Sequence, residues 1–171
     1  MSTTRLTTTN GVTFITKSND FFVSKSLEVY GEWSFGEIEL LAQILTKSEN
    51  IVEAGANIGA HTVFLAKDIV PDGKVFAFEP RRILFQNLCA NISINSRTNC
   101  FCSQTALSEK KNEDLYYPNY DFNADQNFGA MSFLRTEKSS STLKANVDTL
   151  DNRFPDLQKL KLLRQMQKEW K

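Results

Sequence analysis

A glycine-containing turn between two apolar segments constrains the fold of this chain more than any other feature. The apolar pair Ile51 and Val52 predicts a buried parallel strand, and Gly55 and Gly59 follow within a few residues. Glycine takes backbone angles that a Cβ forbids, so the chain can turn sharply here and let a ligand approach. We expect a helix to begin near Ile58, with unpaired N–H groups in its first turn available to a carboxylate or a phosphate.

A second strand and an acid follow this turn at the spacing of a nucleotide-cofactor site. Residues 74–78 predict a strand, and Glu79 at its exposed carboxyl end is placed to accept hydrogen bonds from both hydroxyls of a ribose. Two cofactors are compatible with this order of elements, a dinucleotide such as NAD and S-adenosylmethionine. A dinucleotide fingerprint reads G-x-G-x-x-G, whereas Asn57 stands at its second glycine, which favours S-adenosylmethionine.

The motif pattern resembles that of class I methyltransferases, in which E-x-G-x-x-x-G closes one strand and an acid ends the next. Four segments resemble the FkbM family within this class, in family order: YGEWSFGE at 30–37, GANIGAHT at 55–62, FEP at 78–80 and VDTLD at 147–151. The resemblance covers residues 27–163. It implies a Rossmann-like α/β fold and transfer of a methyl group from S-adenosylmethionine.

The same resemblance assigns parts of the cofactor to residues of this chain. Glu53 would meet its amino group, the segment from Gly55 to Gly59 its methionine part and Glu79 its ribose, while the exit of the third strand would lie beside the adenine. The cofactor-binding residues are therefore expected to be Glu53, Gly55, Ala56, Asn57, Gly59, Glu79 and Ala106, with Ser103 and Thr105 as weaker candidates beside the adenine.

No residue is identified as the catalytic base. His61 is the only histidine, and one turn into a helix it is expected to be a packing or surface residue. Glu37 lies on an amphipathic helix expected over residues 36–46, where a solvated position is the default, although the family resemblance makes it a weaker candidate for the site.

Hydrophobic spacing predicts the other elements. A helix is expected over residues 83–92, and Cys100–Cys102 and 106–107 are assigned to the third strand and its exit. The chain is expected to begin with a polar leader, and residues 12–30 are expected to form small strands or a lid. Residues 108–146 predict an inserted β-hairpin with strands at 115–118 and 130–134 around Gly129. Such an insert is where a methyltransferase builds acceptor specificity, or else its aromatic residues merely cover the sheet.

Composition fits a single Rossmann-like domain, with residues 1–50 as leader and helical approach and residues 51–171 as a partial S-adenosylmethionine-binding domain. The 20 basic and 20 acidic residues give no net charge, which argues against nucleic-acid or anionic-membrane partners. No segment reads as a signal peptide or a membrane span, so a cytoplasmic protein is expected. The 3 cysteines, odd in number, predict free thiols and no metal site.

The carboxyl-terminal residues depart from the family pattern. Residues 160–163 resemble the start of a fourth strand, which in the family leads into a K-I-D-V-E-G-like motif, but here the chain continues as RQMQKEWK. If Arg164 is encoded by AGA or AGG, a shifted frame permits K-T-D-A-E-G-M-E. We interpret the tail as a frameshifted remnant and the sheet as incomplete, with a chain that is poorly stable and catalytically silent.

The expected inherited function is S-adenosylmethionine-dependent methyl transfer to a hydroxyl oxygen of a small molecule or sugar. Two alternatives stay open at this point, an inactive cofactor-binding fragment or interaction module, and an NAD-dependent oxidoreductase. The sequence does not predict the oligomeric state.

Overall fold

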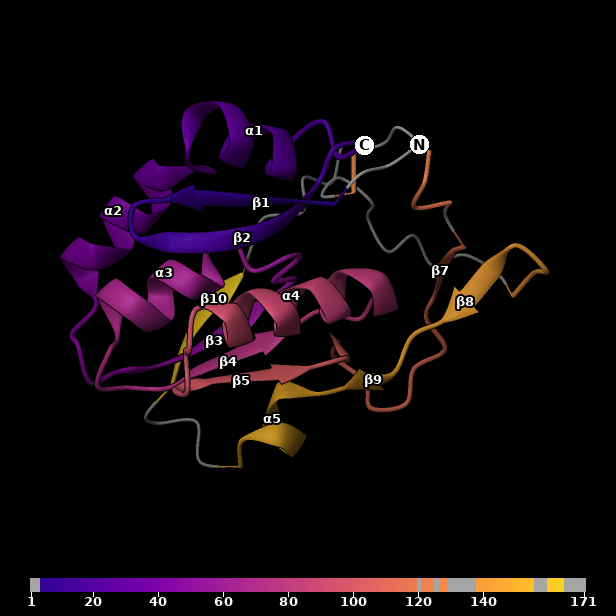
Figure 1. Cartoon of the computed structure of the whole chain (residues 1–171). Coiled ribbons are helices and arrows are strands. Elements are labelled where there is room, and N and C mark those ends of the chain that lie inside the picture. Colours follow the sequence, from indigo (N-terminus) through magenta and orange to yellow (C-terminus); the bar gives the residue numbers. More distant parts are fainter. Residues whose placement is uncertain (1–3, 120, 125–126, 129–137, 156–159, 165–171) are drawn as a thin grey trace.

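A four-stranded parallel sheet forms the centre of the molecule (Figure 1). The structure is a computed structural model that describes residues 4–119, 121–124, 127–128, 138–155 and 160–164. The strands lie in the order β10 (Leu160–Arg164), β3 (Asn50–Ala54), β4 (Val75–Phe78) and β5 (Cys100–Ser103). Across the sheet from β5 to β10, the strands are the third, second, first and fourth in chain order. These are the first four of the six strands of the Rossmann order 3-2-1-4-5-6, so the expected fold class is confirmed, as is the strand beginning at Leu160.

The register of the sheet brings the ends of its strands to one edge. Ala54 is the partner of Arg164 on one side and of Phe78 on the other, and Phe78 is the partner of Ser103. Because all four strands are parallel, the segments that follow them leave from this carboxyl edge. In sheets of this order, ligands bind outside the carboxyl ends where the strand order reverses, which here is between β3 and β10.

Helices cover one face of the sheet along its length. The predicted helix after Glu79 is confirmed as α4 (Arg82–Ile94), which buries Leu88 and Ile92 against the sheet. A short α3 (Thr62–Phe64), continued by a π-helical turn η1 (Leu65–Ile69), lies on the same face (Figure 1). Cys100 and Cys102 pack against this core as free thiols, and a hydrogen bond of 4.0 Å joins their sulfur atoms.

The opposite face of the sheet carries phenylalanine rings. Phe154, which follows the short α5 (Leu150–Arg153), contacts the rings of Phe76 and Phe78 at centroid distances of 4.8 and 6.2 Å. Phe101 stacks on Phe76 at 5.5 Å and is 48% exposed. This face is therefore only partly covered by the described residues.

The amino-terminal segment is structured, unlike the polar leader that the sequence suggested. Thr4–Thr9 (β1) and Val12–Lys17 (β2) form an antiparallel hairpin. Threonine is β-branched and favours strands, and Asn10 and Gly11, with φ of 48° and 70°, make the tight turn that such pairs favour. The expectation of small strands over residues 12–30 holds only for β2.

Two helices follow the hairpin. Val23–Tyr30 forms α1 instead of a strand, because the Asp20 carboxylate accepts the N–H of Ser24 at 2.9 Å and caps the first turn. Gly31, at φ 73°, ends this helix. The helix expected over residues 36–46 is confirmed as α2 (Phe35–Ile44).

Asn91 of α4 and Asn95, directly after its last residue, bind the hairpin to the domain. Asn95 accepts the N–H of Thr13 at 2.8 Å and donates to its carbonyl at 2.7 Å. Asn91, one turn earlier, accepts the N–H of Ile15 at 2.6 Å and donates to the carbonyl of Ile58 at 2.8 Å. A single buried amide thus connects β2 with the turn that follows β3.

The first strand of the predicted insert is confirmed, and it pairs with a strand that the sequence did not predict. Tyr116–Pro118 (β7) pairs antiparallel with Thr142–Lys144 (β8), in the register Tyr117 with Leu143. The strand expected at 130–134 and the turn at Gly129 lie outside the described residues. Ala106–Leu107 (β6) pairs with Val147–Asp148 (β9) at the base of the insert. A small core, separate from the main one, lies beneath these strands and comprises Ala106, Leu115, Tyr117, Ala145 and Val147.

Candidate functional site

The turn after β3 lies at the carboxyl edge and is fastened to the neighbouring strand. The N–H groups of Gly55 and Ala56 both donate to the carbonyl of Phe78, at 2.8 and 3.0 Å. Gly55, Asn57 and Gly59 have φ of 83°, 54° and 85°. These left-handed conformations postpone the helix, which begins at Thr62 and not near Ile58 as expected, and whose α-helical part spans 3 residues. The helical segment, which η1 continues to Ile69, therefore starts about one turn later than the sequence predicts.

The two glycines serve different purposes. A Cβ on Gly55 would meet nothing within 4 Å, so the space beside this residue is open. A Cβ on Gly59 would lie 2.8 Å from Cδ1 of Leu88, so Gly59 lets the turn approach α4. Of the two, only Gly55 faces room for a ligand. Ala56 is buried in the main core and can offer a ligand its backbone alone.

Asn57 carries a polar atom without a partner. Its side chain is 4% exposed, and Oδ1 accepts no hydrogen bond from the described residues. A buried acceptor left unpaired costs free energy, so an orphan of this kind marks a place where a ligand or water can donate. The backbone N–H of Asn57 is already used, since it donates to Oε2 of Glu79 at 3.0 Å.

Glu53, at the end of β3, is buried beneath the turn. It is 2% exposed, and its Oε2 accepts a hydrogen bond of 2.6 Å from the hydroxyl of Thr62. Burial raises the pKa of Glu53 to about 7, because a carboxylate loses its hydration inside the protein. Near neutral pH the group is therefore only partly ionised. Thr62 was not predicted as a site residue, although a hydroxyl three residues after Gly59 is a detectable signal.

Glu79 is not the exposed strand end that the sequence suggested. Its side chain is fully buried, and both oxygens are occupied. Oε1 accepts from the backbone N–H and Nε of Arg81, at 3.0 and 2.9 Å. Oε2 accepts from Nη2 of Arg81 at 3.3 Å and from the N–H of Asn57. A carboxylate has about four acceptor positions, so a ribose hydroxyl has to displace one of these donors.

Arg81 is the residue that the sequence reading missed. It is 2% exposed, and besides Glu79 it binds the carbonyl of Phe128 through Nη1 at 2.7 Å. The Arg81 side chain therefore closes over the acid and ties it to the insert. An arginine two residues after the acid was visible in the sequence, but nothing there indicated that its side chain turns back.

The first motif of the family resemblance supports the turn. The Glu32 carboxylate accepts the N–H of Phe35 at 2.6 Å and so caps α2. The carbonyl of Trp33 lies 2.9 Å from Nε2 of His61, whose pKa is lowered by burial. The His61 ring is thus a neutral packing group, as expected. Glu37 is mostly exposed, with Oε2 4.0 Å from Nδ1 of His61.

The candidates beside the adenine lie at the exit of β5. Ser103 and Thr105 share a hydrogen bond of 3.1 Å between their hydroxyls, and Thr105 also accepts from Nη2 of Arg153 at 3.1 Å. Ala106 is buried in the small core of the insert. Arg153 in turn forms an ion pair of 2.7 Å with Asp148, from the fourth motif. This motif therefore joins α5 to the strand exit.

Within the described residues, no helix is long and apolar enough to cross a membrane. The same part of the chain contains no cluster of three or more histidine, cysteine or acidic side chains arranged to hold a metal ion.

Comparisons with known proteins give fold-level similarity only. No protein-family model matches the chain, and no curated protein matches it. Among solved structures, M. jannaschii TYW2 in complex with AdoMet is similar, with 20% identity, a TM-score of 0.45 and coverage of 66% of this chain and 54% of that one. P. horikoshii TYW2 in complex with MeSAdo has 20% identity and a TM-score of 0.45, over 62% and 37% of the two chains. M. jannaschii tRNA m1G37 methyltransferase has 14% identity and a TM-score of 0.44, over 64% and 36%. The chain thus spans at most 54% of the length of these proteins.

Proposed function

We propose that the chain binds S-adenosylmethionine at the carboxyl edge of its sheet and serves methyl transfer to a hydroxyl group of a small molecule or sugar. The observation that carries the proposal is a turn, at the point where the strand order reverses, that combines open space beside Gly55 with the unpaired Oδ1 of Asn57 two residues later. Rossmann-like sheets bind nucleotide cofactors at this point.

The residues of the turn fit this cofactor better than a dinucleotide. A dinucleotide site aims free loop N–H groups and a helix start at a pyrophosphate. Here the N–H of Asn57 is held by Glu79, and the helical segment after the turn begins only at Thr62. S-adenosylmethionine has no phosphate and brings an amino group, for which Glu53 and Oδ1 of Asn57 are suitable acceptors. Glu79 would hold the ribose after Arg81 moves aside.

When bound, the cofactor supplies an activated methyl group. The protein then has to hold the acceptor hydroxyl in line and take up its proton, which is catalysis by orientation together with a general base. The proposed roles are an amino-group contact for Glu53, methionine contacts for the backbone from Gly55 to Gly59, and an adenine contact near Ala106. The acceptor is proposed to be a small molecule because the chain has no net positive charge with which to bind nucleic acid.

Calorimetric titration with S-adenosylhomocysteine, S-adenosylmethionine and NAD tests the proposal. We expect the first two to bind more tightly than NAD. Gly55→Val should abolish binding because its side chain enters the open space and its φ of 83° is unfavourable for valine. Gly36→Ala is the matched control, since a Cβ there also meets nothing within 4 Å but lies on α2.

Stronger NAD binding would replace the proposal with an oxidoreductase. Binding of S-adenosylmethionine without methyl transfer to any hydroxylated acceptor would leave a cofactor-binding module. Failure of all three ligands to bind a folded chain would exclude a cofactor site.

A further inference from the structure

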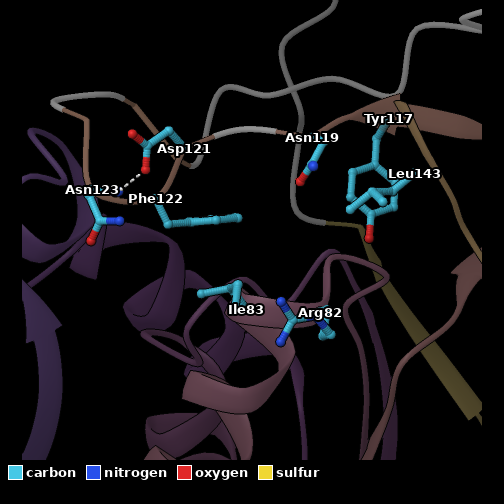
Figure 2. Close-up of a pocket in the computed structure, with 8 residues that line it drawn as sticks. All are labelled: Arg82, Ile83, Tyr117, Asn119, Asp121, Phe122, Asn123 and Leu143. Atoms are coloured by element: carbon cyan, nitrogen blue, oxygen red, sulfur yellow. Dashed lines mark hydrogen bonds between the residues drawn. The ribbon is translucent and has the colours of Figure 1, made fainter. Parts of the chain in front are cut away.

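A cavity of about 250 Å³ lies between the first turn of α4 and the insert (Figure 2). Arg82 and Ile83 form its α4 side, and Asn119, Phe122 and Asn123 lie opposite them in Figure 2. No part of the cofactor site described above lines this cavity. Its volume is near the lower end of ligand pockets, about 300–1,000 Å³, which suits a molecule of one ring.

The polar groups of the cavity are available to a ligand. The side-chain amides of Asn119 and Asn123 have no hydrogen-bond partner among the described residues, and both residues are exposed. Arg82 is exposed too, and its guanidinium makes only a long contact of 3.4 Å to Gln86 within the described part of the chain. Asp121 adds a carboxylate, one oxygen of which accepts the N–H of Asn123 at 2.8 Å. Amide groups, a positively charged guanidinium and a negatively charged carboxylate therefore lie around one opening.

The apolar walls are made of rings and branched side chains. Phe122 lies across the cavity in Figure 2, with Ile83 below it, and Tyr117 and Leu143 close one end. A flat apolar wall beside amides, a carboxylate and a guanidinium suits a ring that has C–H groups on one face and hydroxyls at its edge. A phosphate would meet the Asp121 carboxylate, and a purely apolar ligand would leave the amides and Arg82 unpaired.

A short chain of contacts joins this cavity to the acid of the cofactor site. The Phe122 ring lies 5.0 Å from the ring of Phe128, centroid to centroid. The carbonyl of Phe128 accepts from Arg81, whose guanidinium covers Glu79. A ligand against Phe122 is thus separated from the acid by two residues.

We propose that this cavity binds a hydroxyl-rich ring, such as one sugar unit, of a larger methyl acceptor whose reacting hydroxyl lies outside the cavity, at the cofactor site. The assignment to the acceptor rests on the proposed function, whereas binding of the ring does not. Arg82, Asn119 and Asn123 hold its hydroxyls, and Phe122 packs against its C–H face. The insert therefore determines acceptor specificity, and its aromatic residues do more than cover the sheet.

Saturation-transfer NMR on the full chain, without cofactor, tests the proposal. The probes are the methyl glycosides of glucose, mannose and galactose, with uridine, adenosine and cyclohexanol as comparison ligands. We expect at least one glycoside to bind. Asn119→Ala combined with Arg82→Ala should weaken that binding by about tenfold or more, since each substitution removes a hydrogen bond. Asn146→Ala is the matched control, an exposed asparagine of the insert outside the cavity, and should leave affinity unchanged.

Each outcome decides the proposal. It is overturned if no glycoside binds, if the cavity variants bind as the unsubstituted chain does, or if nucleosides bind and glycosides do not. Binding of S-adenosylhomocysteine without glycoside binding rejects the cavity and keeps the proposed function. Glycoside binding without S-adenosylhomocysteine binding keeps the cavity and rejects the proposed function.

Discussion

Glu53 makes folding depend on pH. Its pKa rises from 4.5 to about 7 on folding, so between these values the folded chain keeps a proton that the unfolded chain loses. The stabilising contribution is complete below about pH 4.5 and disappears as the pH rises through about 7. We expect Glu53→Gln to remove this dependence and to increase the free energy of unfolding at pH 8. Urea unfolding at several pH values measures it, with the exposed Glu109→Gln as control. Parallel profiles for the two variants would contradict the prediction.

The same carboxyl predicts proton release on cofactor binding. A cationic amino group beside Glu53 favours the carboxylate and lowers its pKa. We therefore expect S-adenosylhomocysteine to displace a fraction of a proton near pH 6.5, in line with a pKa of about 7 in the free protein. Titration calorimetry in two buffers of different ionisation enthalpy detects this release. Equal heats in both buffers, with binding intact, would place the amino group elsewhere.

The buried pair of Glu79 and Arg81 is expected to stabilise the fold and, if Glu79 holds the ribose as proposed, to weaken cofactor binding. Removing either partner leaves the other charge buried, which costs about 3–5 kcal/mol. We expect Glu79→Leu and Arg81→Leu each to destabilise the fold by that order, and the double variant to lose less than the sum. Arg81→Leu should also bind S-adenosylhomocysteine more tightly, because the acid no longer has a competing donor.

Urea unfolding provides the double-mutant cycle, and calorimetry provides the affinities. Arg82→Leu is the neighbouring control, since Arg82 does not contact Glu79 in the structure. Additive losses of stability would show that the two side chains act independently. Unchanged affinity in a folded Arg81→Leu chain would show that Glu79 does not hold the ribose.

At the scale of elements, α4 organises the site through Asn91. Replacing Asn91 with alanine leaves the N–H of Ile15 and the carbonyl of Ile58 without the side-chain amide that now binds both. Each buried unsatisfied group costs about 1–3 kcal/mol. We expect a corresponding loss of stability and faster hydrogen exchange in both β2 and the turn after β3. Asn95→Ala, which releases Thr13 and the carbonyl of Asn91 but neither Ile15 nor Ile58, should leave exchange in the turn after β3 unchanged. Faster exchange confined to β2 in Asn91→Ala would contradict the coupling.

Elements with strong hydrophobic spacing could be predicted from the sequence, whereas those determined by side-chain capping or distant pairing could not. The buried strand at Ile51 and the α4 helix follow from apolar runs and from spacings of three and four. The start of α3 depended on the positive φ of Asn57, which residue type alone does not specify. The partner of β7 depended on chain that returns at Thr142, a pairing that local spacing does not reveal.

The sequence predicted where the candidate site lies, but not that its acid is buried and paired with an arginine. The order of turn, strand and acid was enough to place Gly55, Asn57 and Glu79 together. The burial of Glu79 and its closure by Arg81 depend on how a long side chain folds back over the sheet edge, a tertiary choice without sequence periodicity. The unpredicted part of the site is therefore its electrostatic pairing.

At the scale of the whole molecule, charge balance limits the partners. With 20 basic and 20 acidic residues, the chain lacks the excess of cations that drives counterion release from nucleic acids. We expect no binding of tRNA or duplex DNA at 50 mM salt in an electrophoretic mobility assay with micromolar protein. A salt-dependent shift would indicate a basic surface and would turn the search for an acceptor toward RNA.

The bond between Ile15 and Asn91 also has a consequence in time. The two residues are 76 positions apart. At a synthesis rate of about 5–20 residues per second, Asn91 is added about 4–15 s after Ile15. Throughout that interval the outer edge of β2 has no partner from α4, so the newly made hairpin is open to other strands on the ribosome. Synthesis of Asn91 thus ends the interval during which the exposed edge of β2 can pair with other strands.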